Sequence, residues 1–420
     1  MTSKQLDDAL TISDEWRGIL SLRELIETRL QRADALGETI DIVAIGKASR
    51  GMTNACREIF GDQVRRSFLV VDEADASDSP TSVVVVGEHP LPGAGSVRAG
   101  ERLVEFLAEP TDATCTLFLV SGGASSLCAR PQPPVDVEDL HEFFNAALES
   151  GTDITALNQL RAATSSIAGG AVLRHVLTVR SIALIMVDNV ISGASWVASA
   201  LTYEYEPSGS DVTALLGRID RLATPLATRV FESSERRRQS LQHRVTTAHE
   251  NLVVAQPSML LDTAVRSAER RGYRVVPVGS DLHGDVHGVV DHFSRTLSSE
   301  LLTQGPLCVI GVGEVTVRVR GSGTGGRCQE FAWAMAEVLA ALERPGVFVA
   351  RASDGRDFVP GVAGAWVDAS TTRKAQALGI EWLTVSLRND TFNGLMALDQ
   401  LLDGSSTGWN LCDLYITLFQ

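Results

Sequence analysis

The stretch DIVAIGK, residues 41–47, is a short apolar run that ends in glycine and lysine and precedes residues compatible with a helix. The same theme returns in CTLFLVSGG at 115–123 and in SIALIMVD at 181–188. Continuous runs of valine, isoleucine and leucine that alternate with helices are typical of parallel strands buried on both faces. These stretches therefore predict an α/β fold in which helices cover both sides of a parallel sheet.

Polar residues follow each of these predicted strands, and another pair follows the run TSVVVVG at 81–87. The set comprises Lys47, Glu88 with His89, Ser121–Gly123, and Asp188. Ligands bind outside the carboxyl ends of the strands in such sheets, so we expect these groups to meet at one edge. Lys47 stands out further, because the chain has only two other lysines, Lys4 and Lys374.

A second α/β set follows beyond about residue 250. A helix and a strand are expected in 260–279, then a strand within PLCVIGVGEVTVRVRGSG at 306–323, which includes TVRVR at 316–320, a helix over 329–343, and strands in 347–355 and 413–419. A chain of 420 residues exceeds one ordinary core, so we predict two domains, 1–250 and 251–420. The arginine-rich stretch 209–251 is interpreted as a helix pair or a connection between the domains.

Composition excludes several classes of protein. Hydrophobic residues at 44% and charged residues at 21% indicate a folded chain, and no apolar run reaches the roughly 20 residues of a membrane helix. A net charge of −15 argues against a nucleic-acid surface but not against a small anionic ligand. The start MTSKQLDDAL lacks the pattern of a signal peptide, so a cytoplasmic protein is expected. Six dispersed cysteines predict neither a disulfide framework nor a zinc site.

Two glycine-rich turns are candidates for phosphate binding. VSGGASS at 120–126 and GSGTGGRCQE at 321–330 each join a predicted strand to a predicted helix. Backbone N–H groups in such turns can bind an anion, although a plain strand–helix turn has the same composition. The second turn also fits G-x-G-x-x-G at Gly321, Gly323 and Gly326. A dinucleotide site is therefore an alternative, although no acidic residue ends a strand about 20 residues later.

Acidic side chains are candidates for magnesium binding or for orienting a hydroxyl group. Phosphoryl transfer from a nucleotide needs Mg²⁺, held by one or two carboxylates together with phosphates and water. A loop aspartate is more often a turn or cap residue, but Asp354 and Asp357 share one turn and are predicted to serve one site. His283, His287 and His292 lack a clear metal-site pattern and are interpreted as a surface segment. The candidates are Asp188, Glu314, Asp354, Asp357 and Asp390.

In series, these motifs resemble the glycerate 2-kinase family, whose C-terminal half is the MOFRL domain. The matching segments, in family order, are IGKAS at 45–49, HPLPGAGS at 89–96, SGGASS at 121–126, LNQLRAATSSIAGG at 157–170, VASALT at 197–202, GEVTVRVRGSGTGGRCQE at 313–330, SDGRDFVPGVAGAWVD at 353–368 and TGWNLCDL at 407–414. The resemblance implies a larger Rossmann-like domain, a smaller α/β domain and an active site in the cleft between them.

The resemblance also implies roles for individual residues. An ATP-dependent, Mg²⁺-dependent kinase acting on a small hydroxy acid or polyol is expected, and a homodimer is possible. The implied catalytic residues are Lys47, Arg327, Asp188 and Asp354, of which Asp188 and Asp354 would bind Mg²⁺. The implied nucleotide-binding residues are Ser121, Gly122, Gly123, Ser125, Gly323, Gly325 and Gly326. The implied substrate-binding residues are His89, Asn158, Arg161, Glu314, Gln329, Glu330 and Asp357.

Several positions depart from the family pattern. Ala162 and Ala168 stand where the family has lysines, Ser192 where it has an aspartate, and Cys328 where it has an asparagine. Lost positive charge weakens recognition of a small carboxylate, and a lost carboxylate weakens Mg²⁺ binding. Because these losses argue against D-glycerate as the sole candidate, the expected substrate is D-glycerate or a related small polar acceptor. A catalytically impaired relative that still binds ligand and an NAD(P)-dependent hydroxypyruvate reductase remain alternatives.

Overall fold

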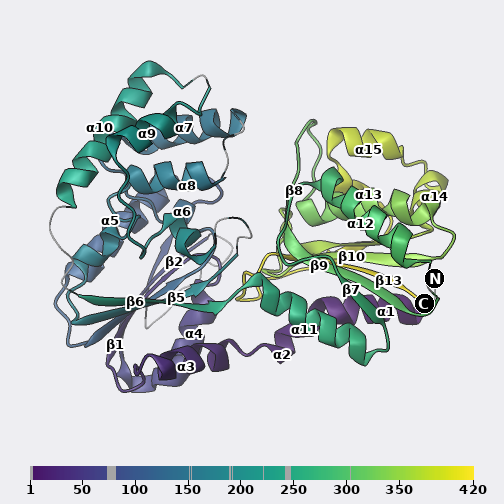
Figure 1. Cartoon of the computed structure of the whole chain (residues 1–420), viewed down its shortest axis with the longest axis horizontal. Helices are drawn as coiled ribbons and strands as arrows, with labels where there is room; N and C mark the ends of the chain where they lie inside the picture. The colour runs from purple at the N-terminus through teal and green to yellow at the C-terminus, as the bar shows by residue number, and fades with distance from the viewer. Residues whose placement is uncertain are drawn as a thin grey trace. The chain divides into compact units, whose positions relative to one another are not determined.

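The computed structural model describes residues 3–72, 82–150, 152, 154–188, 191, 193–220, 222–241, 247–302 and 304–420. The contacts divide the chain into two compact units (Figure 1). The parallel-sheet unit is Leu22–Ala255, and the mixed-sheet unit is Gln256–Gln420 together with the N-terminal helices α1 (Ser3–Asp14) and α2 (Trp16–Ile19). Ser192, the position of the missing family aspartate, lies outside the described residues.

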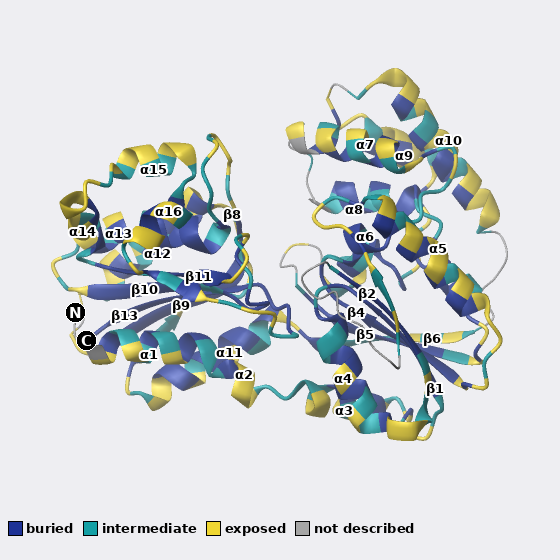
Figure 2. Ribbon diagram, turned by 180° about the vertical axis from the view of Figure 1, so that it is seen from behind, coloured by how far each residue is buried: buried dark blue, intermediate teal, exposed yellow. Residues whose placement is uncertain are grey.

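The parallel-sheet unit is built on six strands in the order β3-β2-β1-β4-β5-β6, and all neighbouring strands are parallel. The strands are β1 (Ile40–Ile45), β2 (Val64–Val71), β3 (Val83–Val86), β4 (Cys115–Val120), β5 (Arg180–Met186) and β6 (Ala248–Ala255). Every residue of β1 and β4 is buried, as the unbroken apolar runs predicted (Figure 2). The strand order reverses between β1 and β4, where ligand sites form in such sheets.

Helices cover both faces of this sheet. On one face lie α3 (Leu22–Arg32) and α4 (Ser49–Phe60), and on the other lie α5 (Ala94–Ala108), α6 (Ala124–Leu127) and the 3-10 helices η3 (Ala171–His175) and η4 (Ala194–Ser199). A helical layer packs on its own apolar core and comprises α7 (Val137–Glu149), α8 (Ile154–Ala163), α9 (Gly209–Leu216) and α10 (Thr224–Ser240). The arginine-rich stretch therefore contains a helix pair, which belongs to this unit.

The mixed-sheet unit has seven strands, of which six form the path β12-β11-β10-β13-β9-β7 and β8 pairs with β9. Its strands are β7 (Arg274–Pro277), β8 (Leu282–Asp285), β9 (Leu307–Thr316), β10 (Gly346–Ala352), β11 (Val362–Asp368), β12 (Leu401–Asp403) and β13 (Asp413–Phe419). The remaining helices are α11 (Pro257–Arg270), α12 (Val286–Glu300), α13 (Arg327–Ala341), α14 (Thr371–Ala377), α15 (Trp382–Arg388) and α16 (Thr391–Ala397). The strand expected within 306–323 is β9, which ends at Thr316, so the expectation is wrong only for its TVRVR end.

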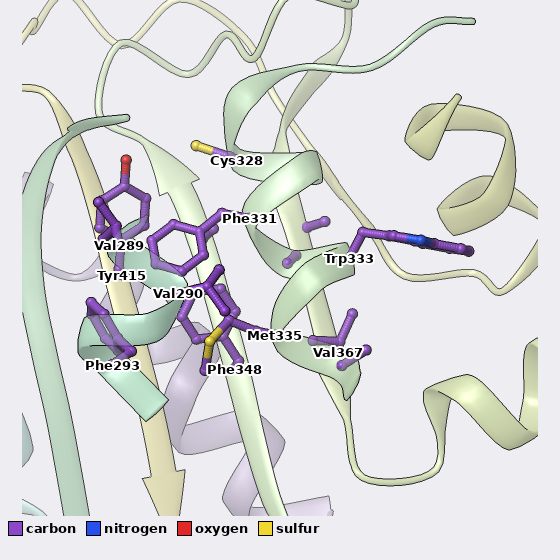
Figure 3. Close-up of a cluster of buried hydrophobic side chains, with 14 of the residues drawn as sticks. Val289, Val290, Phe293, Cys328, Phe331, Trp333, Met335, Phe348, Val367 and Tyr415 are labelled. Atoms are coloured by element: carbon purple, nitrogen blue, oxygen red, sulfur yellow. The ribbon is translucent and has the colours of Figure 1, made fainter. Parts of the chain in front are cut away.

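Aromatic side chains fill the core of the mixed-sheet unit (Figure 3). Phe331 of α13 lies 4.6 Å from Tyr415 of β13 and 5.0 Å from Phe348 of β10, measured between ring centroids. Helices α12 and α13 cover this face of the sheet, whereas α1 and α11 cover the other. No helix within the described residues is both long and apolar enough to cross a bilayer. The structure confirms the α/β class and shows that the second sheet is mainly antiparallel, a feature not predicted from its strands.

Candidate active site

The candidate site begins where β1 and β4 end side by side. The backbone N–H of Lys47 donates to the carbonyl of Gly122 at 3.0 Å, and the N–H of Ala48 donates to the Ser121 hydroxyl at 3.0 Å. Ser121 is fully buried. The hydrogen bond to its hydroxyl group links the turn after β1 to the turn after β4. These bonds bring Lys47 and the Ser121–Gly123 turn together, at the edge that the sequence predicted for a ligand.

Two further side chains reach the same point at Gly123. A Cβ added to Gly123 would lie 3.2 Å from Cδ2 of His89 and 3.4 Å from Cγ of Lys47. Gly123 also has a φ of +80°, which strongly favours glycine. An imidazole and the stem of a lysine therefore converge on the turn after β4, although they come from separate loops. Asp188 follows β5, the neighbour of β4, at the same edge of the sheet.

Glu88, next to His89, has a structural role. Its carboxylate accepts hydrogen bonds from the N–H groups of Gly95 and Ser96 at 2.9 and 2.7 Å and from the Ser96 hydroxyl at 2.8 Å. Burial raises the pKa of Glu88, but these hydrogen bonds outweigh burial and lower the pKa overall. An ionised Glu88 thus holds the start of α5 and orders the loop that carries His89.

A cavity of about 40 Å³ lies beside this edge and is lined by Ser125, Arg161, Ser165 and Ser199 among others. A single water needs about 10–15 Å³, so the cavity has room for a small ligand but not for a nucleotide. The Ser125 and Ser199 hydroxyl groups lie 2.8 Å apart, and the Ser199 hydroxyl donates to Asn158 Oδ1 at 3.3 Å. The sequence analysis did not name Ser199 as a site residue. Ser199 nevertheless bonds to Ser125 and Asn158, two residues that the sequence analysis did name.

Arg161 is one of the two arginines that line the cavity, the other being Arg130. The guanidinium of Arg161 lies 4.3 Å from the ring centroid of Phe144, and within the described part of the chain no carboxylate pairs with it. Burial lowers the pKa of Arg161 to about 10, so the side chain keeps its charge at neutral pH. A cation held over an aromatic ring without a carboxylate partner is suited to binding an anion.

Arg327 begins α13 in the mixed-sheet unit and is paired with a residue that the sequence analysis missed. Its Nε and Nη2 atoms lie 2.5 and 2.7 Å from the two carboxylate oxygens of Asp413, and Nη2 lies 3.4 Å from Glu314. Burial raises the pKa of Asp413 to about 7, although Arg327 opposes the shift. An aspartate at the start of the apolar run DLYITLF was the available signal, because a charge buried in a strand needs a partner.

Asp354 and Asp357 have different hydrogen-bond partners, and their service to one site stays a prediction. Asp357 is fully buried and accepts hydrogen bonds from the N–H groups of Cys328 and Gln329 at 3.1 and 3.0 Å and from the Gln329 side chain at 2.9 Å. Asp354 instead accepts from the N–H of Arg356 at 2.9 Å. Asp357 is therefore a cap residue, because its carboxylate accepts hydrogen bonds from the N–H groups of Cys328 and Gln329 in the first turn of α13. A substrate contact by either residue stays a prediction.

The glycine turn at 321–326 is filled by the chain itself. The N–H of Gly323 donates to the carbonyl of Arg388 at 2.8 Å, and the N–H of Thr324 donates to Asp390 at 3.0 Å. A Cβ on Gly323 would lie 2.5 Å from the Arg388 carbonyl oxygen. The N–H of Gly323 is therefore already bonded within the protein, and nucleotide binding by Gly323 stays a prediction. Nucleotide binding by Gly325 and Gly326 stays a prediction as well.

Glu330 lies on α13 near the same turn. It is 9% exposed and accepts long hydrogen bonds from Asn389 at 3.4 Å and Thr391 at 3.3 Å. Burial raises the pKa of Glu330 to about 7, and the two hydrogen bonds only partly oppose the shift. Its predicted contact with substrate stays a prediction.

Two family models match the chain. Residues 17–232 match a domain of unknown function, DUF4147, and residues 307–413 match the MOFRL family. The first match covers more than half of the chain. The chain belongs to the DUF4147 family. The MOFRL match confirms the resemblance inferred from the ordered motifs. The DUF4147 segment of this protein contains Lys47, the Ser121–Gly123 turn and Arg161.

Relatives and solved structures agree with this assignment. The DUF4147 chain is 27% identical to the D-glycerate 2-kinase of Thermotoga maritima, covering 91% of each chain, and 27% identical to human glycerate kinase, covering 91% of this chain and 84% of that protein. It is 26% identical to a putative hydroxypyruvate reductase of Agrobacterium vitis, covering 89% and 97%. The crystal structure of the Thermotoga maritima glycerate kinase matches over 100% of both chains with a TM-score of 0.83 at 24% identity, and this likeness confirms the fold.

Proposed function

We propose that this protein is an ATP-dependent kinase that phosphorylates a hydroxyl group of D-glycerate or a related small polar acceptor. The observation that carries the proposal is the convergence of Lys47 and His89 at Gly123, where the strand order of the sheet reverses. A cavity lined by Arg161, which pairs with no carboxylate among the described residues, lies beside the Ser125 end of the same loop. The relatives named glycerate kinase support the same activity.

The proposed acceptor binds through its carboxylate to Arg161 and through its hydroxyl groups to Ser125 and Ser199. The nucleotide phosphates lie at the Ser121–Gly123 turn. The acceptor oxygen attacks the γ-phosphorus, a new O–P bond forms, and the bond from the γ-phosphorus to the bridging oxygen of ADP breaks. Lys47 stabilises the charge on the transferred group, because catalysis of phosphoryl transfer rests mainly on positioning and electrostatic stabilisation.

A carboxylate orients the acceptor hydroxyl or accepts its proton in this proposal, and Asp188 is the candidate. Asp188 also suits Mg²⁺, which takes one or two protein carboxylates and completes its shell with phosphates and water. The described residues hold no group of three or more metal-binding side chains, which agrees with a metal bound largely through substrate. When bound, Mg²⁺ would neutralise charge on the nucleotide phosphates.

The alternatives receive less support. The reductase alternative rested on the turn at 321–326, whose Gly323 and Thr324 N–H groups are bonded within the protein. The impaired-relative alternative has one specific observation in its favour, because Ala168, which stands in place of a family lysine, lines the cavity beside Arg161. The two arginines that line the cavity, Arg161 and Arg130, would then have to bind the acceptor carboxylate without that lysine.

The test is ADP formation from ATP and Mg²⁺ with a panel of small hydroxy acids and polyols. We expect turnover with a carboxylate-bearing acceptor and its loss in Lys47→Ala. Lys374→Ala is the matched control, since Lys374 is half-exposed and its partner, at 3.5 Å, is the buried carboxylate of Asp368 in the mixed-sheet unit. Absence of turnover with every acceptor, while ATP still binds, would favour the impaired-relative alternative.

A further inference from the structure

One wall of the cavity is a short irregular segment, residues 165–169, which follows α8. Ser165, Ile167 and Ala168 of this segment line the cavity. The wall has a few hydrogen bonds of its own, including those from the N–H groups of Ile167 and Ala168 to the Ser165 hydroxyl at 3.2 and 3.1 Å. A segment outside helices and strands needs other partners for its carbonyl groups. Backbone N–H groups supply some, from Ala171 to Ala168 at 3.2 Å and from Tyr205 to Gly169 at 3.3 Å, and one side chain binds three of the carbonyls.

That side chain is Arg237 of α10, which is 1% exposed. Its Nε donates to the carbonyl of Ser165 at 2.9 Å, and Nη2 donates to the carbonyls of Ala168 and Gly169 at 2.8 and 3.0 Å. Nη1 donates to the carbonyl of Tyr205 at 3.2 Å. One planar guanidinium thus fixes three carbonyls of the cavity wall and ties them to a second loop.

A glycine in the wall also leaves space for the Arg237 guanidinium. Gly169 has a φ of +58°, and a Cβ added there would lie 2.4 Å from Nη2 of Arg237 and 3.0 Å from the Tyr205 carbonyl oxygen. Any larger residue would push the guanidinium away from the segment. The contact therefore depends on both partners, an arginine on α10 and a glycine in the wall.

Arg237 keeps its charge in this position. Burial lowers its pKa to about 10, a shift that nearby Glu206 opposes, so the group is protonated at neutral pH. Within the described residues no carboxylate forms an ion pair with it. A buried cation is costly unless hydrogen-bonded, and here carbonyl oxygens satisfy it. Its charge therefore strengthens the hydrogen bonds that hold the wall.

We propose that Arg237 is a positioning residue for the acceptor: it holds the 165–169 wall against which the acceptor binds, without contacting the acceptor itself. This inference rests on the proposed function for its kinetic consequences. It predicts that loss of the guanidinium weakens acceptor binding selectively, because the Lys47–Gly123 region has its own hydrogen bonds and none comes from Arg237.

The experiment compares Arg237→Met and Arg237→Lys with the natural protein. We expect the KM for D-glycerate to rise about tenfold or more in Arg237→Met, because misplaced positioning groups lower affinity and rate steeply. The KM for ATP should stay within about twofold. Arg237→Lys keeps the charge but cannot span the carbonyls, so it should rescue only part of the loss. Arg180→Met is the control, because Arg180 of the same unit also donates to carbonyls, those of Ala33 and Asp34, away from the cavity.

Hydrogen exchange provides a readout independent of turnover. In Arg237→Met, and to a lesser degree in Arg237→Lys, the amides of residues 167–170 should exchange faster while those of β1 and β4 do not. Unchanged exchange at 167–170, or equal rises in the KM for ATP and for the acceptor, would overturn the proposal. If the natural protein turned over no acceptor, the proposed function would fail, whereas exchange would still decide whether Arg237 holds the wall.

Discussion

At the scale of single residues, charge and burial distinguish binding groups from structural ones. Arg161 has a charge and no carboxylate partner within the described part of the chain, whereas Arg327 is satisfied by Asp413. Both were singled out from the sequence, in which the two arginines look alike. What separates them is the partner, and partners far apart in the sequence meet only in the folded chain.

Replacement of Arg161 by methionine should weaken acceptor binding. A hydrogen bond to a charged group contributes about 1.5–3 kcal/mol, so the KM for a carboxylate-bearing acceptor should rise by about 10- to 150-fold. The KM for ATP should not change. Steady-state kinetics with each substrate varied in turn checks this. An equal rise for an uncharged polyol would contradict a carboxylate contact. Arg102→Met is the control, because Arg102 is an exposed arginine of α5 that pairs with Glu105 and does not line the cavity.

Glu330 should make the stability of the protein depend on pH. Burial raises its pKa from 4.5 to about 7, so the folded state binds this proton more tightly than the unfolded state. The resulting stability is fully present below pH 4.5 and is lost as the pH rises through about 7. Glu330→Gln should therefore raise the free energy of unfolding at pH 8, by at most about 3 kcal/mol, and leave it nearly unchanged at pH 4.

Urea denaturation at both pH values measures the effect of Glu330→Gln. Glu337→Gln is the matched control, since Glu337 is an exposed glutamate on the same helix, α13. A gain of equal size at pH 4 and pH 8 would contradict the assignment, because packing rather than ionisation would then account for it.

At the scale of elements, the two glycine turns have different tasks. The turn after β4 lies against Lys47 and His89, whereas the turn before α13 packs against the Arg388–Thr391 region. Both carry the composition of a phosphate-binding turn. Backbone N–H groups bind a ligand only when the protein leaves them unbonded, and that depends on which segment lies over the turn.

Gly323→Ala should lower stability without a selective effect on the KM for ATP. The new Cβ would lie 2.5 Å from the Arg388 carbonyl oxygen and 2.7 Å from the Asp390 Cα, so the backbone must shift. We expect a loss of about 1–3 kcal/mol, the usual cost of overpacking. Thermal denaturation and ATP kinetics check this, with Gly288→Ala as the control, since a Cβ there has nothing within 4 Å. A large rise in the KM for ATP with unchanged stability would restore the phosphate-binding interpretation.

At the scale of the whole molecule, the first segment of the chain belongs to the same compact unit as the last segment. Helix α1 is the first element of the chain, yet Gln5 donates to the carbonyl of Leu418 at 2.7 Å and Asp8 accepts from the Tyr273 hydroxyl at 2.9 Å. Glu15, just after α1, pairs with Arg271 at 2.6 Å. The N-terminal segment thus completes the mixed-sheet unit, and β6 extends the parallel sheet to Ala255, past the boundary predicted at 250.

Removal of residues 1–15 should therefore loosen the C-terminal half of the chain. We expect faster hydrogen exchange in α11 and β13, which α1 contacts, and unchanged exchange in β1 and β4 of the other unit. Mass-spectrometric exchange on the full-length and shortened proteins measures this. Faster exchange confined to β1 and β4 would contradict the assignment of α1 to the mixed-sheet unit.

The sequence by itself determined the parallel sheet, most of its strands and the edge at which Lys47, Ser121–Gly123 and Asp188 gather, because apolar runs and glycine turns are local patterns. It also determined the family, through eight ordered motifs. The tertiary structure alone decided the antiparallel second sheet, the pairing of Arg327 with Asp413, the filled turn at Gly323 and the hold of Arg237 on the cavity wall. These features depend on contacts between residues distant in the chain, such as the 86 positions that separate Arg327 from Asp413, and no local pattern encodes which distant group will satisfy a buried charge or N–H.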